Sequence, residues 1–591
     1  MGQRSQSLAT VVAGGSPSPA TVGVSSILDR IWVHVAAYAL LLVAITAIIP
    51  LDASFGGDDG AYGGQVHALE RGSWALERPV AVVPTENEGW LNTAITDEGP
   101  LPYTSNPAYA LLLAAMPGDG SLGLQLVPLF GALGSAAAAW VVARALRPTA
   151  TDAGAATLAF WSVALGPVLV NSTTLWAHTA STAVGGLSVV ALLQLVAATR
   201  SPVPPADGWW RRAAAPAVLL AGALLAASLL RTEAVFWIVA IAATAAIGVT
   251  AGITRVAVAT ATVVGLGSWF MNRSWGLALR ADRLPIDTAV VAPEDTAAWL
   301  ASRVPAAWRL LLTSLGGGLG ALIALAALSL SIAAAARIRR SRGQAGSAAD
   351  APTTTSNVPT ALLFASAGTY LLHSALAPGE TISGTVAAWP IVPVLLIVGW
   401  PRHSIRRTFG RAGRLTDVGL VLLPAILFTA AVLLTQYSLS GGHQWGGRYL
   451  SMAFVPLGAA AAVLGWPILR SPQHRAGLLA VLVAPALVGT IASGQLHNKH
   501  QNIVADTTAI PAEVVVTEVI ALPRIAWTAL PTAYYVADGE SVEELLGRLA
   551  TSGVESVNVH GLGETPLDGT AGYRVTEERG SIRHLQLETG S

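Results

Sequence analysis

The chain has 591 residues, of which 53% are hydrophobic and 12% are charged, and its mean hydropathy is +0.57. Because a soluble domain carries roughly 25% charged residues, this composition excludes an ordinary soluble protein of this length. The formal net charge is zero, so no nucleic-acid partner is expected, and the absence of cysteine rules out disulfides and thiolate metal ligands.

The N-terminal residues 1–27 are rich in Ser, Gly, Ala and Pro and lack periodicity, so they are predicted to form a disordered cytoplasmic tail. No A-x-A cleavage site follows the first apolar run, which is therefore interpreted as a retained anchor. Apolar runs of about twenty residues then recur along the chain, the length that a bilayer core requires. We predict about thirteen transmembrane helices, near residues 31–50, 121–146, 153–171, 174–199, 213–230, 232–250, 255–271, 310–336, 359–377, 386–400, 417–436, 449–466 and 475–493.

The arginines in the short loops indicate the orientation of these helices, because cytoplasmic loops carry an excess of Lys and Arg. If the N-terminus is cytoplasmic, all the Arg-rich loops between spans fall inside, including residues 337–342 and 402–414. The first external loop, residues 51–105, holds nine acidic residues against Arg71 and Arg78. We therefore predict a multi-pass protein of the plasma membrane with a cytoplasmic N-terminus.

The transmembrane domain is predicted to occupy residues 28–494, including a shorter apolar piece at 106–116 that is re-entrant or interfacial. Residues 495–591 differ in character, with thirteen acidic residues against five Arg and no run that could span a bilayer. Residues 533–537 and 556–560 are strand-like, and Ser541 with Glu544 forms a capping box for the helix between them. This β–α–β pattern predicts a small extracytoplasmic α/β domain for packing or acceptor recognition.

The first candidate site is the acidic pair Asp58 and Asp59, which lies between glycines early in the first external loop. A carboxylate at a bilayer surface can serve as a general base towards a hydroxyl. The structural alternative is that the pair caps a helix in a solvated loop. Residues 62–72, beginning with Tyr62, are spaced as an interfacial amphipathic helix.

The second candidate site is the segment 440–450, at the outer ends of two predicted spans, with His443, Gln444, Trp445 and Arg448. An arginine on the Arg-poor face runs against the positive-inside bias, and phosphate is the partner that best matches its planar fork. The alternative is an arginine whose guanidinium reaches out towards lipid headgroups.

The third candidate site is Arg231 and Glu233, in a short outer connection between two spans. These two side chains either pair with each other or contribute to a site. The tryptophans at span ends suit an aromatic belt. No zinc-ligand spacing, Walker A loop, G-x-S-x-G elbow or dinucleotide fingerprint is present in the sequence.

In this order and on one face, the three clusters resemble the membrane-embedded GT-C glycosyltransferases, which use polyprenyl-phosphate sugar donors at the outer membrane surface. Asp58-Asp59 with Tyr62 is similar to the acidic pair of their first external loop, with Asp in place of the commoner Glu. Residues 106–109, Arg231-Thr232-Glu233 and Trp445-Gly446-Gly447-Arg448-Tyr449 are similar to further elements of bacterial members. The W-W-D-x-G signature of oligosaccharyltransferases is absent, and so is a second external Asp-x-Asp for a metal.

The resemblance implies transfer of a sugar from a polyprenyl-phosphate donor to an envelope glycan, lipid or protein. It makes Asp58 and Asp59 the catalytic carboxylates, and Arg448 and Arg231 the donor-phosphate ligands. Tyr62, His443, Gln444, Trp445 and Glu233 would then contact substrate. No cofactor is required by the motifs, and dependence on a divalent metal is left open.

Two other classes of protein remain as hypotheses. A secondary transporter would show internal repeats and ionisable residues near the bilayer midplane. The spans hold almost no internal charge and the candidates gather at one surface, which favours interfacial chemistry. A non-catalytic scaffold of envelope assembly would use the acidic loop and the C-terminal domain as a docking surface.

Overall fold

The computed structural model describes most of the chain. The described residues are 24–49, 57–76, 94–96, 99–101, 106–117, 121–147, 153–200, 209–279, 296–313, 318–345, 357–400, 409–411, 414–435, 445–469, 471–517, 533–536, 542–561 and 567–588.

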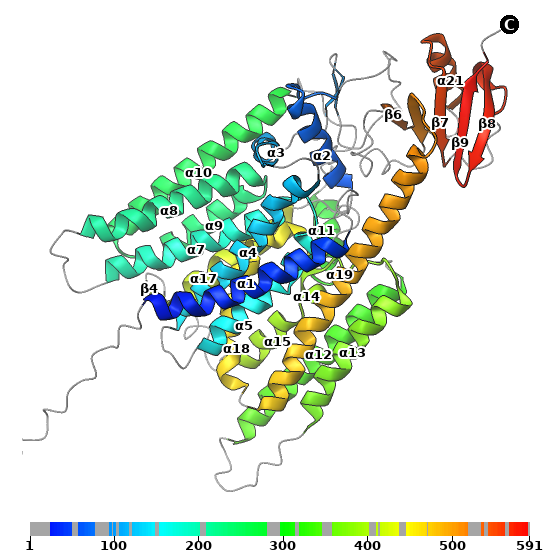
Figure 1. The fold of residues 1–591 in the computed structure, drawn as a ribbon. Coiled ribbons are helices and arrows are strands. Elements are labelled where there is room, and N and C mark those ends of the chain that lie inside the picture. The colour runs from blue at the N-terminus through cyan, green and yellow to red at the C-terminus, as the bar shows by residue number, and fades with distance from the viewer. Residues whose placement is uncertain are drawn as a thin grey trace, which may run out of the picture.

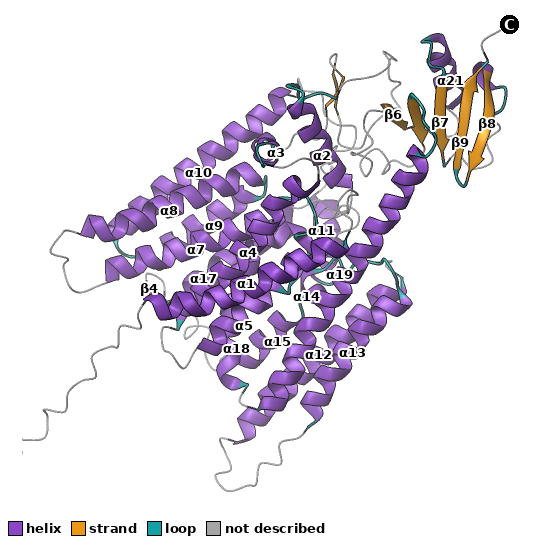
Figure 2. Cartoon of the chain, viewed as in Figure 1, coloured by secondary structure: helices purple, strands orange, loops and turns teal. Residues whose placement is uncertain are grey.

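Most described residues belong to one helical bundle, drawn in purple in Figure 2. Its helices in chain order are α1 (Val24–Ile48), α2 (Gly57–Glu70), α3 (Pro107–Ala114), α4 (Ser121–Leu146), α5 (Ala153–Ala164), α6 (Pro167–Asn171), α7 (His178–Arg200), α8 (Trp209–Leu230), α9 (Ala234–Gly248), α10 (Gly252–Leu279), α11 (Thr296–Leu311), α12 (Leu319–Ala345), α13 (Val358–Leu376), α14 (Thr385–Ala388), α15 (Ile391–Gly399), α17 (Asp417–Thr435), the 3₁₀ helix η2 (Arg448–Ala453), α18 (Phe454–Gly465), η3 (Trp466–Ile468) and α19 (Pro472–Thr508). Two short hairpins accompany them, β1 (Ala94–Thr96) with β2 (Gly99–Leu101) and β3 (Gly410–Arg411) with β4 (Arg414–Leu415).

Among the described residues, nine helices are long and apolar enough to cross a membrane. They are α1, α4, α7, α8, α10, α12, α17, α19 and the unit η2–α18–η3, and α5 and α9 are shorter apolar helices. The prediction of a helical multi-pass membrane protein is therefore confirmed. The number thirteen is not confirmed, because some of the predicted spans are broken.

Proline explains one of these breaks. The predicted span 153–171 divides into α5 and α6 at Gly166, directly before Pro167, whose ring removes a backbone donor and cannot continue the preceding helix. The predicted span 386–400 divides into α14 and the nine-residue α15 around Trp389 and Pro390. Hydropathy alone does not detect such interruptions, since the segments on both sides remain apolar.

Small residues let the helices approach closely, as is usual for packing within a membrane. On α4, a Cβ added at Gly131 would overlap the backbone nitrogen of Ala180 and lie 2.7 Å from the Thr179 hydroxyl. That hydroxyl donates to the Pro128 carbonyl at 2.8 Å, and the Ser135 hydroxyl lies 2.7 Å from the Gly131 carbonyl and 3.0 Å from the Thr179 carbonyl. The crossing of α4 and α7 is thus fixed by both packing and polar contacts.

We expect Gly131→Ala to destabilise the bundle by about 1–3 kcal/mol, the usual cost of overpacking a tight contact. Gly222→Ala on α8 is the matched control, because a Cβ there meets nothing within 4 Å. Alanine favours a helix over glycine by roughly 0.5–1 kcal/mol, so the control is expected to be neutral or slightly stabilising. Thermal unfolding in detergent measures both. Equal melting temperatures for the two variants would contradict the tight crossing.

The two ends of the bundle differ in character. At one end, Arg200 at the end of α7 forms a 2.7 Å ion pair with Asp417 at the start of α17, beside β4. At the other end lie α2, α3 and the C-terminal domain (Figure 1). The start of α7, at His178, belongs to this second end, which the arginine pattern predicts to be the outer end.

The segment predicted as an interfacial amphipathic helix is largely buried instead. Tyr62 and Val66 of α2 are 7% and 3% exposed. They belong to one apolar cluster with Tyr109 and Leu113 of α3 and with Trp176. The expectation of a surface helix was wrong because α3, distant in sequence, covers the face that would otherwise meet lipid.

The C-terminal domain has a five-stranded sheet in the order β6-β5-β7-β9-β8. It contains β5 (Val514–Thr517), β6 (Ala533–Val536), β7 (Ser556–His560), β8 (Tyr573–Arg579) and β9 (Ile582–Leu587), with α21 (Val542–Thr551) and the short η5 (Thr570–Gly572). Strands β6 and β7 and the helix between them confirm the predicted β–α–β pattern. Strand β5 pairs in parallel with both β6 and β7.

Helix α19 carries the domain away from the bundle (Figure 1). It continues to Thr508, past residue 493, where hydropathy placed the end of the last span. The Asn558 side chain of β7 donates to the carbonyls of Thr507 and Ile510, so the sheet is hydrogen-bonded to the end of this helix.

Candidate active site at the outer end

A rigid turn between α6 and α7, residues 172–177, organises the outer end. The hydroxyls of Ser172, Thr173 and Thr174 each donate to the carbonyl three residues earlier, at 2.6, 2.8 and 2.9 Å. The residues of this turn are all buried. The backbone N–H groups of the same three residues also donate to these carbonyls, at 3.2, 3.1 and 3.4 Å, so backbone and side-chain bonds together hold the turn.

Asp59 binds this turn from α2. Its Oδ1 accepts the backbone N–H of Leu175 at 2.8 Å, and the residue is 1% exposed. The Tyr109 hydroxyl donates to the Leu175 carbonyl at 2.7 Å, and the Tyr62 ring meets the Tyr109 ring edge-on at 5.1 Å. Asp59 is therefore not the cap of a solvated helix but a buried link between α2 and the turn. Asp58 lies in α2, and its side chain is outside the described residues.

Arg448 reaches the same turn from η2. Its guanidinium carbon lies 4.6 Å from the ring centre of Trp176 and 5.0 Å from that of Tyr449, and Nη2 donates to the Tyr449 hydroxyl at 3.0 Å. The residue is only 8% exposed. Because Trp176 follows Leu175 directly, the Asp59 carboxylate and the Arg448 guanidinium contact adjacent residues of one turn.

Two glycines make the loop before Arg448 possible. Gly446 and Gly447 have φ of +68° and +65°, a conformation that side chains disfavour. A Cβ at Gly447 would also overlap the Thr385 hydroxyl. The backbone N–H groups of Gly446 and Gly447 donate to the carbonyls of Ile382 and Ser383 at 2.9 and 2.5 Å.

Helix α7 holds the other side of this loop. The Ser451 hydroxyl of η2 lies 2.9 Å from the Ser181 hydroxyl, and the Thr182 hydroxyl donates to the Ser451 carbonyl at 3.0 Å. Arg448 is thus fixed from both sides by backbone and hydroxyl contacts rather than projecting freely towards solvent.

Arg231 and Glu233 pair with each other, as one of the two hypotheses for them stated. Arg231 Nε and Nη2 donate to the two Glu233 oxygens at 2.9 and 2.8 Å, and the side chains are 13% and 9% exposed. Arg231 Nη1 also lies 2.8 Å from His178 Nδ1, which must accept because a guanidinium only donates. The Arg231 guanidinium carbon is 5.9 Å from the Tyr449 ring, so both guanidiniums contact the same aromatic ring.

Electrostatics favours the charged form of Glu233. Burial alone would raise the pKa of this carboxyl, but the charge and hydrogen bonds of Arg231 outweigh burial and hold the pKa below its ordinary value of 4.5. Arg448 lowers the pKa of Glu233 further. The carboxylate therefore balances part of the positive charge that the two arginines bring together.

We expect Glu233→Gln to destabilise the protein by about 3–5 kcal/mol at neutral pH, because it leaves Arg231 buried without its counter-charge. A depressed folded pKa gives stability that is present above the unfolded pKa and is lost as pH falls through the folded value. The gap in melting temperature between wild type and variant should therefore narrow below pH 4.5. Asp417→Asn, which breaks the half-exposed pair with Arg200, is the control and should change melting little. A gap that widens on acidification would contradict the assignment.

The structure describes one of the three remaining predicted site residues. His443 and Gln444 lie outside the described residues. Trp445 is 1% exposed, and its ring lies against Gly489, so this side chain packs against α19 in the interior of the bundle. The contribution of Trp176 was missed at the sequence level, since a tryptophan at a span end is indistinguishable from a member of an aromatic belt. Tyr449 was noted as part of the motif that ends at this residue, but without a role of its own.

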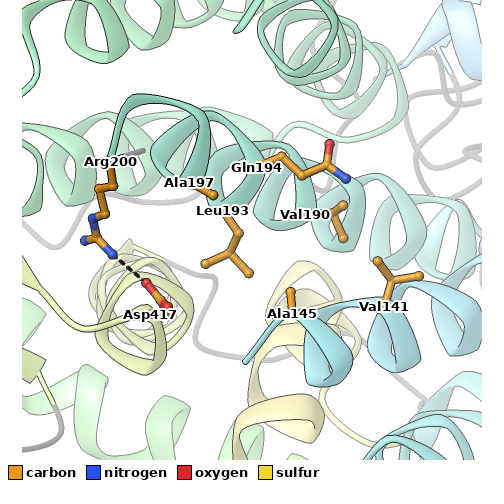
Figure 3. A pocket seen from close by; sticks show the side chains of 8 residues that line it. All are labelled: Val141, Ala145, Val190, Leu193, Gln194, Ala197, Arg200 and Asp417. Carbon is orange, nitrogen blue, oxygen red and sulfur yellow. Dashed lines mark hydrogen bonds and ion pairs between the residues drawn. The ribbon is translucent and has the colours of Figure 1, made fainter. Parts of the chain in front are cut away.

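No group of three or more His, Asp or Glu side chains that could hold a metal ion occurs in the part of the chain that the structure describes. A cavity of about 530 Å³ lies away from the turn 172–177, between α4 and α7 near the Arg200–Asp417 pair (Figure 3). Apart from that ion pair and Gln194, its lining consists of Ala, Val and Leu side chains.

Comparison with known proteins gives structural neighbours but no sequence family. No protein-family model matches the chain, and no curated protein matches it. The oligosaccharyltransferase of Archaeoglobus fulgidus tethered to an acceptor peptide aligns with 90% of this chain and 69% of its own, at 12% identity and a TM-score of 0.48.

The oligosaccharyltransferase AglB from Archaeoglobus fulgidus, in complex with an inhibitory peptide and a dolichol-phosphate, aligns at 11% identity and a TM-score of 0.45, over 90% of this chain and 70% of its own. ArnT from Cupriavidus metallidurans aligns over 95% of this chain and 98% of its own, at 12% identity and 0.41. These neighbours are GT-C membrane glycosyltransferases, the superfamily that the sequence clusters resemble.

Proposed function

We propose that the chain is a GT-C-type glycosyltransferase that moves a sugar from a polyprenyl-phosphate donor to an envelope glycan, lipid or protein at the outer face of the membrane. The observation that carries the proposal is the turn 172–177, where a buried carboxylate and a buried guanidinium contact the adjacent residues Leu175 and Trp176. These groups come from segments more than 380 residues apart in the chain. The three sequence clusters that resemble the GT-C superfamily supply the substrate class.

Arg448 suits the role of phosphate ligand. Transfer breaks the bond between the anomeric carbon and the phosphate oxygen, and the leaving polyprenyl phosphate gains negative charge. A preorganised cation stabilises such developing charge most effectively in a site that excludes water. The Trp176 and Tyr449 rings and the Tyr449 hydroxyl hold the Arg448 guanidinium in place beside the turn, so its positive charge is preorganised.

Arg231 is proposed to add a second positive charge to this site. It contacts the same Tyr449 ring as Arg448, while Glu233 and His178 fix its orientation. Glu233 would then act as a positioning residue through Arg231 rather than as a direct substrate ligand.

The acidic pair is proposed to divide two roles. Asp59 is occupied by the Leu175 N–H and is buried, which suits a residue that positions the turn. We assign to its neighbour Asp58 the role of general base. It would take the proton of the acceptor hydroxyl as that oxygen attacks the anomeric carbon, so one C–O bond forms as the other breaks.

The proposal is tested with the purified full chain in liposomes, supplied with radiolabelled polyprenyl-phosphate sugars and envelope extract. Transfer of label from the lipid donor to an acceptor is the expected result. A folded protein that turns over no donor would overturn the proposal. Uptake of a solute into the same liposomes, without sugar transfer, would favour the transporter hypothesis instead.

A further inference from the structure

Helix α11 has an unusual distribution of polarity for a segment outside the long apolar spans. Leu300, Val304 and Trp308 lie on one face at helical spacing and are 53%, 72% and 38% exposed. Ala306 and Leu310, on the opposite side, are fully buried. Arg303 is only partly exposed, with its guanidinium 5.6 Å from the Trp299 ring centre. The most exposed face of this helix is therefore apolar.

The surroundings of α11 indicate what covers this face. Arg303 Nη1 lies 3.4 Å from the carbonyl of Leu434, in the last turn of the membrane span α17. The side chains of Leu434 and Ile426 on that span are 49% and 44% exposed, as expected for residues that face lipid. Helix α11 therefore lies beside the last turn of α17, and the exposed side chains of both helices are apolar.

We infer that α11 lies in the outer leaflet, with the face formed by Leu300, Val304 and Trp308 in contact with lipid chains. A helix with such a face is stabilised at a membrane in proportion to the apolar area that it buries there. Tryptophans at positions 299 and 308 suit the level of the headgroups. The occupant of this surface is bilayer lipid rather than a protein partner.

The end of α11 touches the loop that carries Arg448. The Thr385 hydroxyl shares its proton between the carbonyls of Leu310 in α11 and Gly446 in the loop, at 3.1 and 3.2 Å. Gly384 approaches the backbone of Leu312 so closely that a Cβ there would overlap it. A lipid-borne donor that arrives along α11 therefore meets the arginine loop at the end of the helix. The arrival of a donor along α11 rests on the proposed function, whereas the membrane position of α11 does not.

Because the chain contains no cysteine, a single fluorophore can be attached at any position that is changed to cysteine, and the position of α11 can be measured in this way. A fluorophore on Val304→Cys is compared in liposomes with one on Ile426→Cys of α17 and one on Ser552→Cys of the exposed C-terminal domain, using nitroxide-labelled phospholipids as quenchers. We expect quenching at Val304→Cys, as at Ile426→Cys, and none at Ser552→Cys. Quenching as weak at Val304→Cys as at Ser552→Cys would overturn the membrane position, whatever the activity of the protein.

The link to the site is tested separately with Thr385→Val, which keeps the shape of the side chain and removes both hydrogen bonds. We expect a severalfold loss of sugar transfer with unchanged quenching at Val304→Cys. Thr244→Val on α9 is the matched control, because its buried hydroxyl donates to the Ala240 carbonyl of its own helix. Equal transfer by the two valine variants would refute the link and leave the lipid contact standing. Absence of transfer in the wild type with normal quenching would refute the proposed function alone.

Discussion

Arg448→Lys is expected to lower sugar transfer by about 10²–10³-fold, the usual effect of removing one preorganised charge-stabilising donor. Lysine keeps the charge but loses the planar fork that is proposed to bind two phosphate oxygens and that lies over the Trp176 and Tyr449 rings. The loss should fall mainly on kcat, because the charge on phosphate grows as the bond to the sugar breaks. Steady-state transfer in liposomes measures it.

Arg475→Lys is a closely matched control for this experiment. The Arg475 guanidinium also stacks on a tryptophan, 4.2 Å from the Trp466 ring centre, and its Nε donates to the Leu469 carbonyl at 2.7 Å. It lies at the start of α19, at the end of the bundle away from the turn 172–177. Both variants lose a stacked guanidinium, so equal transfer by the two would show that Arg448 has no special role in catalysis.

Asp58→Asn is expected to reduce transfer by about 10²–10⁴-fold, the contribution of a positioned general base. Asparagine keeps the size of the side chain but cannot take a proton from the acceptor hydroxyl. Binding of the polyprenyl-phosphate donor should be retained, because that interaction is assigned to the arginines. Transfer and donor binding are measured on the same preparation.

Asp59→Asn distinguishes the role of Asp59 from that of Asp58. An amide oxygen can still accept the Leu175 N–H, although more weakly than the carboxylate, so we expect a smaller loss of transfer together with a lower melting temperature. Asp417→Asn, at the other end of the bundle, provides the control for loss of one negative charge. If Asp58→Asn and Asp59→Asn, singly and together, leave transfer unchanged, the catalytic role of the pair is refuted.

The sequence by itself determined the features that depend on local patterns. A bilayer requires a long apolar segment for every span, so the lengths of the apolar runs located the long helices from α1 to α19. The period of the pattern was sufficient for β6, α21 and β7, whereas Ser541 of the predicted capping box lies outside the described residues. Arg231 and Glu233, two positions apart, were recognised as a possible ion pair, which the structure contains.

Only the tertiary structure decided which side chains meet. Asp59, Tyr109 and Arg448 contact the turn 172–177 because α2, α3 and η2 converge on it, and apolar run length contains no information about that convergence. The same convergence buries α2, which local periodicity placed on the membrane surface. In a membrane, most spans are equally apolar on all faces, so packing of small residues and hydrogen bonds, rather than hydrophobicity, selects which helices become neighbours.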